Sequence, residues 1–156
     1  MRFSAKGEYG VMAILELALS SGQGPVQVRN IAVRQGIPVR FLEQVMSTLK
    51  KAGLVESIRG AQGGYILSRP STEISLAQVL EAIDGPIRPM DCVSGEKTSL
   101  CHQAKDCVVK DVWEEVKVSI AGVLNSITLN DMCERKRKKL NLPHVMKQLP
   151  SEQSER

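Results

Sequence analysis

The chain has 156 residues, of which 42% are hydrophobic and 24% are charged, and this is enough apolar content to bury a core without disulfides. No apolar run approaches the ~20 residues that span a bilayer, so we expect no membrane partner. The first stretch, MRFSAKGEYG, is polar and does not look like a secretion signal, and we therefore expect a cytoplasmic protein.

The formal net charge is +4, and it is unevenly distributed along the chain. Residues 1–70 carry nine Lys and Arg against four Asp and Glu, whereas residues 71–130 carry five against nine and residues 131–156 carry seven against four. A basic first half followed by an acidic middle favours contact between the first half and a polyanion. A solvated basic surface without a partner is the alternative.

The first predicted helix covers residues 5–20, because apolar side chains recur there at the spacing of one helix face: Val11, Ile14, Leu15 and Ala18. The sequence GQGP at 22–25 ends this pattern. A short helix over about 28–35 follows and stops at Gly36.

The third predicted helix begins near Pro38, runs to about Ala52 and has two distinct faces, with Gly53 placed for a C-terminal cap. The face that must meet the core carries Leu42, Val45, Met46 and Leu49. The opposite face carries Arg40, Glu43, Gln44, Ser47 and Lys51. Arg and Gln can donate paired hydrogen bonds to base edges, and Glu can accept one from cytosine. With the short helix and the turn RQGI before it, this pattern favours a helix-turn-helix over a merely solvated polar face.

A β-hairpin is predicted directly after this helix, in the segment LVESIRGAQGGYIL from Leu54 to Leu67. Its glycine-rich centre carries Arg59 and Gln62. A hairpin in this position is a wing, and its exposed Arg suits a phosphate or the minor groove. A nucleotide phosphate cradle is the rival interpretation, but no helix opens on the glycines and no GK[ST] follows them.

The second half of the chain contains two more helical patterns. Residues 75–83 form a short helix that Ser75 caps and DGP ends. Further on, one apolar stripe covers about five turns: Val109, Val112, Trp113, Val116, Ile120, Val123, Leu124 and Ile127. A second copy of the chain is the natural cover for such a stripe, which predicts a homodimer, whereas packing back onto the first helix is the alternative.

These patterns predict a mainly α-helical fold with a small β-hairpin wing. We expect a winged helix-turn-helix DNA-binding domain over residues 1–85, a cysteine-rich loop over 86–108, a long dimerisation helix over 109–132 and a basic, disordered tail over 133–156.

The segment CVSGEKTSLCHQAKDC gathers Cys92, Cys101 and Cys107 around His102, and the rest of the chain holds one more cysteine, Cys133. Cytoplasmic thiols stay reduced, so a metal site or redox chemistry is favoured over a disulfide framework. We expect no enzyme, because there is no CxxC motif and only His102 could serve a cysteine as a base. An iron–sulfur site, a zinc site and accidental clustering all stay open on these residues alone.

Four stretches, MRFSAKGEYG, FLEQVMSTLKKAGLVESIRGAQGGYIL, EAIDGPI and VLNSITLNDM, resemble the bacterial winged-helix regulators of the Rrf2 family over roughly residues 1–132. That family includes the iron–sulfur regulator IscR, the nitric-oxide sensor NsrR and the cysteine regulator CymR. The resemblance implies a homodimeric transcription regulator, a repressor or an activator, that binds a double-stranded DNA operator. The family's DNA contacts fall on Arg40, Phe41, Glu43, Gln44 and Arg59, with Phe41 standing where relatives often have Tyr.

The resemblance also implies that the three cysteines hold an iron–sulfur cluster, with a 2Fe–2S cluster favoured over a 4Fe–4S cluster. Some relatives use a His three residues after the last cysteine as the fourth ligand, but Lys110 stands there, and an ammonium group is no ligand. Other relatives use an acidic residue near the N-terminus of the partner subunit, and Glu8 stands at that position. His102 is the second candidate. A zinc or thiol-based sensor site on the same fold is the alternative.

Overall fold

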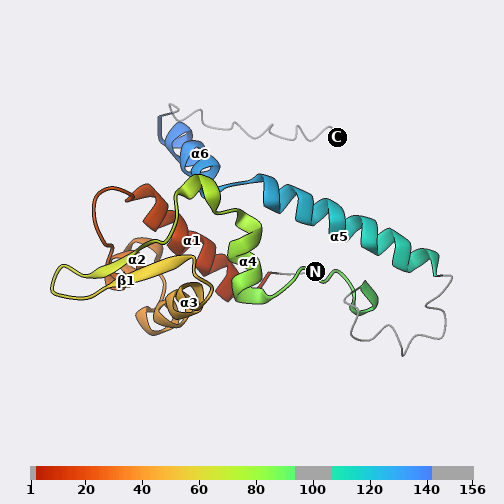
Figure 1. The fold of residues 1–156 in the computed structure, drawn as a ribbon, viewed down its shortest axis with the longest axis horizontal. Helices are drawn as coiled ribbons and strands as arrows, with labels where there is room; N and C mark the ends of the chain where they lie inside the picture. Colours follow the sequence, from red (N-terminus) through yellow and green to blue (C-terminus); the bar gives the residue numbers. More distant parts are fainter. Residues whose placement is uncertain (1–2, 94–106, 142–156) are drawn as a thin grey trace, which may run out of the picture.

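The structure, a computed structural model, describes residues 3–93 and 107–141 and shows a mainly helical fold with one antiparallel β-hairpin (Figure 1). Within these residues, no helix is both long enough and apolar enough to cross a membrane. The elements follow in the order α1 (Ala5–Leu19), α2 (Val28–Gln35), α3 (Val39–Lys51), β1 (Val55–Ile58), β2 (Gly64–Leu67), η1 (Ser71–Glu73), α4 (Leu76–Asp84), η2 (Asp91–Val93), α5 (Val108–Ser126) and α6 (Leu129–Asn141). The predicted fold class is confirmed.

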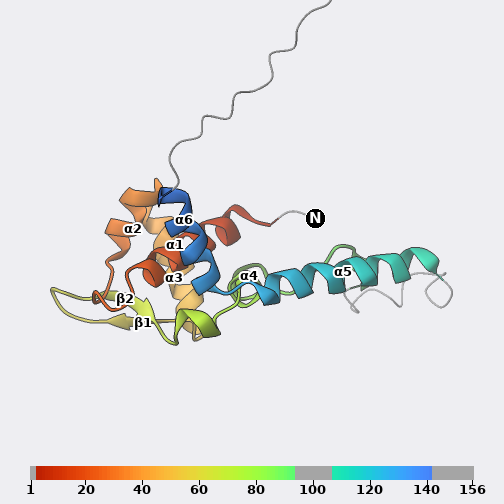
Figure 2. The same ribbon diagram turned by 90° about the horizontal axis from the view of Figure 1, so that it is seen from above.

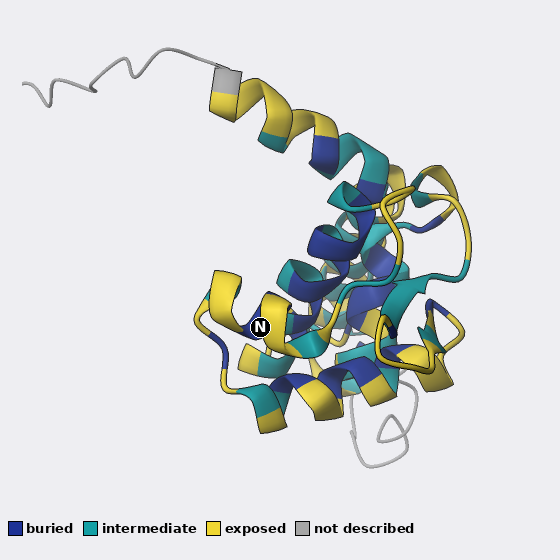
Figure 3. Cartoon of the chain, turned by 90° about the vertical axis from the view of Figure 1, so that its left-hand side faces the viewer, coloured by how far each residue is buried: buried dark blue, intermediate teal, exposed yellow. Residues whose placement is uncertain are grey.

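α1 is the central helix of the winged domain, and it contacts α2, α3, α4, α6 and the hairpin (Figures 1 and 2). Its inward side chains Ala13, Ile14 and Leu17 are at most 3% exposed. Ile31 of α2 and Leu129 of α6 are fully buried in the same core. Buried residues are concentrated where these helices face one another, whereas the outer faces are exposed (Figure 3). The predicted first helix is confirmed, but its core-facing side is displaced from the predicted stripe: Ile14 and Ala18 are buried, whereas Val11 and Leu15 are only half-buried.

Two glycines let α1 approach α4 closely. A Cβ atom at Gly10 would lie 2.0 Å from Cδ1 of Ile83, and one at Gly7 would lie 2.5 Å from Oδ2 of Asp84. Ser4 caps α1: its Oγ accepts from the Gly7 N–H at 2.9 Å, and its own N–H donates to Oδ2 of Asp84 at 3.0 Å. The Ser4 hydroxyl also bonds Oδ1 of Asp84. The beginning of α1 is thus joined to the end of α4.

α2 and α3 form the predicted helix-turn-helix. α2 ends at Gly36, which adopts the left-handed conformation with φ 64° and donates its N–H to the carbonyl of Ala32. A side chain would be strained in this conformation, so glycine favours the tight turn. α3 buries the four predicted core residues, Leu42, Val45, Met46 and Leu49. Its opposite face is left for solvent or a partner.

β1 and β2 form the predicted wing, paired antiparallel from Val55↔Leu67 to Ile58↔Gly64. Tyr65 exchanges two backbone hydrogen bonds of 2.9 Å with Val26, just before α2. The hairpin is therefore hydrogen-bonded to the segment just before α2, in addition to its covalent connections to the rest of the chain.

α4 begins as predicted at Ser75, with a reciprocal cap in which Ser75 and Gln78 exchange side-chain and backbone bonds. α5 extends away from the winged domain, with α4 and η2 as its principal neighbours (Figure 1). None of its residues is buried. The helix predicted over 109–132 is too long, because α5 ends at Ser126.

The predicted disordered tail is wrong for residues 133–141, which belong to α6. Ile127 is extended, and its carbonyl accepts from the Leu76 N–H at 2.8 Å, which interrupts the helical ladder. Thr128 then caps α6 by exchanging bonds with Asp131, and the bond from the Thr128 backbone N–H is the main cause that lowers the Asp131 pKa. α6 turns back and buries Cys133 against the core.

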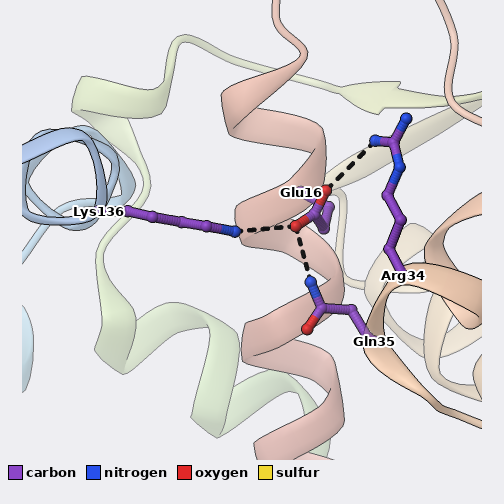
Figure 4. A network of polar contacts seen from close by, with 4 residues as sticks. All are labelled: Glu16, Arg34, Gln35 and Lys136. Atoms are coloured by element: carbon purple, nitrogen blue, oxygen red, sulfur yellow. Dashed lines mark hydrogen bonds and ion pairs between the residues drawn. The ribbon is translucent and has the colours of Figure 1, made fainter. Parts of the chain in front are cut away.

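One carboxylate links α1 to α2 and α6. Glu16, whose polarity interrupts the apolar pattern of α1, is only 7% exposed. Its Oε1 accepts from Gln35 at 2.7 Å and from Lys136 at 3.0 Å, and its Oε2 accepts from Arg34 at 3.4 Å (Figure 4). Burial acts to raise the pKa of Glu16, but the bonds and charges of Lys136 and Arg34 outweigh burial and lower the pKa. The buried charge is therefore well satisfied.

Glu16→Gln should lower the free energy of unfolding at neutral pH by about 1.5–3 kcal/mol, the range for hydrogen bonds to a charged group. A carboxylate whose folded-state pKa is depressed stabilises the fold above its unfolded-state pKa and loses this contribution as the pH falls through the folded-state pKa. The difference between variant and wild type should therefore shrink on acidification, as measured by urea unfolding at several pH values. Glu81→Gln, on the exposed side of α4, is the matched control. A difference that stays constant with pH would contradict this role.

Candidate nucleic-acid interface and thiol segment

The outer face of α3 and the first turn of α1 line one groove. Its lining residues are Lys6, Arg40, Glu43, Gln44, Ser47, Thr48 and Lys51. The structure thus brings together all five side chains that the sequence assigns to the outer face of this helix. It adds Lys6 from a helix that lies more than thirty positions earlier in the chain.

The groove combines cations with neutral hydrogen-bonding groups. Lys6, Arg40 and Lys51 supply positive charge, and Glu43 is the acidic member of the lining set. The side chain of Gln44 is exposed, while its carbonyl accepts from the Thr48 hydroxyl at 3.0 Å. A surface of this composition suits a polyanion whose bases present both donors and acceptors.

Phe41 is placed differently from the other predicted contacts. Its ring packs edge-on against Tyr9 of α1, with ring centroids 5.5 Å apart and planes at 86°. Phe41 is half-buried against the core and is not among the groove-lining residues. In the structure, the Phe41 ring packs α1 against the beginning of α3. A direct contact between Phe41 and DNA stays a prediction.

The wing presents Arg59 to solvent in the turn between β1 and β2. Three interactions fix the hairpin: the Val26–Tyr65 pairing described above, a 2.5 Å bond from Nζ of Lys50 to Oγ of Ser57, and a 3.5 Å bond from Nε2 of Gln27 to the carbonyl of Ala61. The turn itself needs glycine, since a Cβ atom at Gly63 would lie 2.2 Å from the carbonyl oxygen of Ile58. The exposed side chain of Arg59 therefore lies on a hairpin whose position is fixed by these interactions.

Two of the three clustered thiols lie within the described residues, at the two ends of the cysteine segment. Cys92 lies in η2, and Cys107 is the N-cap residue of α5; both are free and half-buried. Nζ of Lys117 donates to the carbonyl of Val93 at 3.4 Å, so η2 lies against α5. Cys101 and His102 lie outside the described residues.

The donor chemistry of this segment fits a metal cluster. The two described thiols are partly accessible and unbridged, and thiolates are the usual ligands of iron–sulfur clusters. Cys133 differs from them, because burial raises the pKa of its thiol, and the opposing charges of Arg137 and Lys136 do not cancel this effect. Among residues 3–93 and 107–141, no group of three or more His, Cys, Asp or Glu side chains surrounds a common point.

The two other residues considered for the fourth ligand position lie on helices. Glu8 is exposed in the first turn of α1, so its carboxylate is open to another molecule. Lys110 lies in the first turn of α5 and is half-buried. Neither residue belongs to a ligand group within the part of the chain that the structure describes.

The apolar stripe of α5 has little cover from its own chain. Val109, Val112 and Val123 of the stripe are 52–59% exposed, and Trp113 and Ile120 are only half-buried. Exposed valines in this number on one helix are typical of a surface that meets a partner. The single chain does not supply that partner within the described residues.

Comparison with known proteins gives a consistent result. A family model described as "Iron-dependent Transcriptional regulator" and called Rrf2 matches residues 3–135. The HTH-type transcriptional regulator IscR of Serratia proteamaculans is 39% identical over 132 residues, which cover 85% of this chain and 79% of the relative. The putative HTH-type transcriptional regulator NMA1593 of Neisseria meningitidis is 39% identical over 136 residues, which cover 87% of this chain and 90% of that protein.

Solved structures share both the fold and the sequence. The T. potens IscR structure superimposes with a TM-score of 0.73 at 40% identity and covers 92% of this chain and 93% of the other. CymR (YrzC), the global cysteine regulator of B. subtilis, gives a TM-score of 0.73 at 32% identity and covers 86% and 98%.

Proposed function

Because this chain belongs to the Rrf2 family of transcriptional regulators, we propose that it is a homodimer that reads operator DNA with the α3 groove and the wing, and that it senses a signal through an iron–sulfur cluster. The observation that carries the DNA-reading part is the groove itself. It holds Gln44, Glu43 and Arg40 on the exposed face of the second helix of a helix-turn-helix. This is the helix that enters the major groove in such proteins.

The proposed division of labour on DNA follows from side-chain chemistry. Gln44 and Arg40 can each form paired hydrogen bonds with a base, and Glu43 can accept from cytosine. Ser47 and Lys51 lie farther along the same face, where they would meet the edge of the groove or a phosphate. Arg59 on the wing would reach a phosphate or the adjacent minor groove.

Cys92, Cys101 and Cys107 are proposed to hold the cluster, preferably a 2Fe–2S cluster, with a 4Fe–4S cluster as the other form. Thiolates are the usual ligands of such clusters, and two accessible thiols frame the segment that contains the third. When bound, the cluster would supply iron whose oxidation state responds to redox conditions. The fourth ligand is proposed to be Glu8 of the partner subunit, with His102 as the second candidate.

The homodimer is proposed to form through α5. None of the stripe residues on this five-turn helix is buried, and packing against the same stripe of a second copy across a two-fold axis would bury its apolar area. The same arrangement would bring Glu8 of one protomer toward the cysteine segment of the other. It would also present two winged domains to two DNA half-sites.

The second candidate function keeps the regulator and replaces the cluster with a thiol-based or zinc site. It is favoured by one comparison, because Staphylococcus aureus CymR, whose structure was solved in an oxidized form, superimposes with a TM-score of 0.70 at 30% identity. Anaerobic purification separates the candidates. A coloured protein with iron and acid-labile sulfide supports the cluster, whereas a colourless protein, with or without zinc, supports the second candidate.

Gln44→Ala should lower affinity by about 1–3 kcal/mol for duplexes that the wild type selects from a random pool, and it should relax preference at particular base pairs. Arg59→Ala should weaken binding to all duplexes and reduce its salt dependence, since fewer counterions are released. Gel-shift titrations at several salt concentrations measure both effects. Gln23→Ala and Arg137→Ala are the matched surface controls. If Arg59→Ala binds DNA with the affinity and salt dependence of the wild type, the wing is not part of the interface.

Changing Cys92, Cys101 or Cys107 to Ala should abolish the visible spectrum of the anaerobically reconstituted protein. The far-ultraviolet circular dichroism should barely change, because the described thiols Cys92 and Cys107 are not part of the core. Cys133→Ala is the matched control and should keep the spectrum. Of Glu8→Ala and His102→Ala, only the loss of the true fourth ligand should alter the spectrum. Unchanged spectra in both would exclude both residues.

Ile120→Asp should convert the dimer to monomers and weaken operator binding strongly, because it places an uncompensated charge in the proposed interface. Val118→Asp is the matched control, since Val118 is 63% exposed and lies on the opposite side of α5 from the stripe. Sedimentation measures the assembly of each variant. An unchanged dimer for Ile120→Asp would show that the α5 stripe is not the interface.

A further inference from the structure

The first turn of α1, which belongs neither to the helix-turn-helix nor to the wing, lies on the same surface as α3. Lys6 lines the groove together with Arg40, Glu43 and Lys51. The side chain is half-buried by its neighbours. Within residues 3–93 and 107–141 no acidic residue forms an ion pair with it. Its positive charge is therefore available to a ligand in the groove.

The position of Lys6 relative to α3 is fixed from two sides. On one side, Gly7 is buried against Asp84, and Ser4 bonds the same carboxylate with its N–H at 3.0 Å. On the other side, Tyr9 packs edge-on against Phe41 at the beginning of α3. A lysine carried on a turn that is held in this way needs little further ordering to meet a ligand.

We propose that Lys6 binds a phosphate of the DNA backbone beside the recognition helix, and that Asp84 is the positioning residue that holds it there. This inference rests on the proposed DNA binding and adds a contact from a helix outside the helix-turn-helix and the wing. The ammonium group is a compact point charge without the planar fork that reads a base, so its contribution is independent of sequence.

The same turn of α1 also carries Glu8, the proposed cluster ligand. At 100° per residue, Lys6 and Glu8 project about 160° apart, on opposite sides of the helix. Gly7 and its contact with Asp84 lie between them. A change in the surroundings of Glu8 would therefore act on the same turn that presents Lys6 to DNA. Asp84 itself ends α4, and the chain runs from there into the segment of Cys92.

Lys6→Ala should reduce the magnitude of the slope of log affinity against log salt by about 0.9 for each protomer that binds. A fourfold rise in salt should then cost the variant about threefold less affinity per protomer than it costs the wild type. At low salt, Lys6→Ala should lose the same factor of affinity for a duplex selected by the wild type and for an unrelated duplex. Lys138→Ala, which removes an equal charge from the exposed side of α6, should leave the slope unchanged.

Asp84→Ala should reduce the slope in the same way, because it releases the turn without removing a charge from the groove. Adding Asp84→Ala to Lys6→Ala should change the slope little further. If Asp84→Ala acted only through a general structural loss, the effects of the two substitutions would add. Asp84→Asn keeps an acceptor for Ser4, so its slope of log affinity against log salt should be close to that of the wild type. Circular dichroism and thermal unfolding confirm that each variant is folded, and Lys6→Gln replaces Lys6→Ala if that variant is not.

The outcomes separate this inference from the function on which it rests. If the wild type shows no sequence preference for any duplex, the proposed function fails. If the wild type binds normally and Lys6→Ala behaves like Lys138→Ala, only the Lys6 contact is overturned. A loss confined to the selected duplex would also overturn it, because that result would make Lys6 a base contact.

Discussion

The packing of α1 is the constraint on which the other elements depend. Its apolar side chains form the centre of the core, its glycines allow α4 to approach, and its ring contact from Tyr9 fixes the beginning of α3. The buried carboxylate of Glu16 adds a polar link from α1 to both α2 and α6 (Figure 4). A shift of α1 would therefore change the position of the recognition helix, of the short helix before it and of the C-terminal helix together.

This central position of α1 gives a physical route between the thiol segment and the α3 groove, the two regions to which we assign function. The thiol segment begins shortly after α4 and ends at α5, while the groove is built by α3 and the first turn of α1. The contact between Ser4 and Asp84 joins the beginning of α1 to the end of α4, which lie next to these two regions in the chain. In the proposed function, a small displacement at the α1–α4 contact would be enough for signalling, since packed interfaces transmit movement as rigid bodies.

The basic segments of the chain do not form one surface. The groove residues lie on α3 and α1, whereas the run of Arg and Lys at 135–139 lies on α6, on the other side of α1 from α3 (Figure 1). One of these residues, Lys136, is engaged with Glu16 inside the protein. Lys136 thus helps to hold α6 against α1, whereas Arg135, Arg137, Lys138 and Lys139 are exposed.

Local patterns in the sequence determined the helix-turn-helix, the wing, the cap at Ser75 and the outer face of α3, because each depends on periodicity or turn chemistry within a few residues. The break at Ile127 was decided by a strand-like pairing with the segment before α4, which no local apolar pattern reveals. The placement of Lys6 beside Gln44, the burial of Glu16 and the folding of α6 all depend on contacts between residues distant in the chain. Those contacts exist only once the core has formed, and this is why tertiary structure alone could supply them.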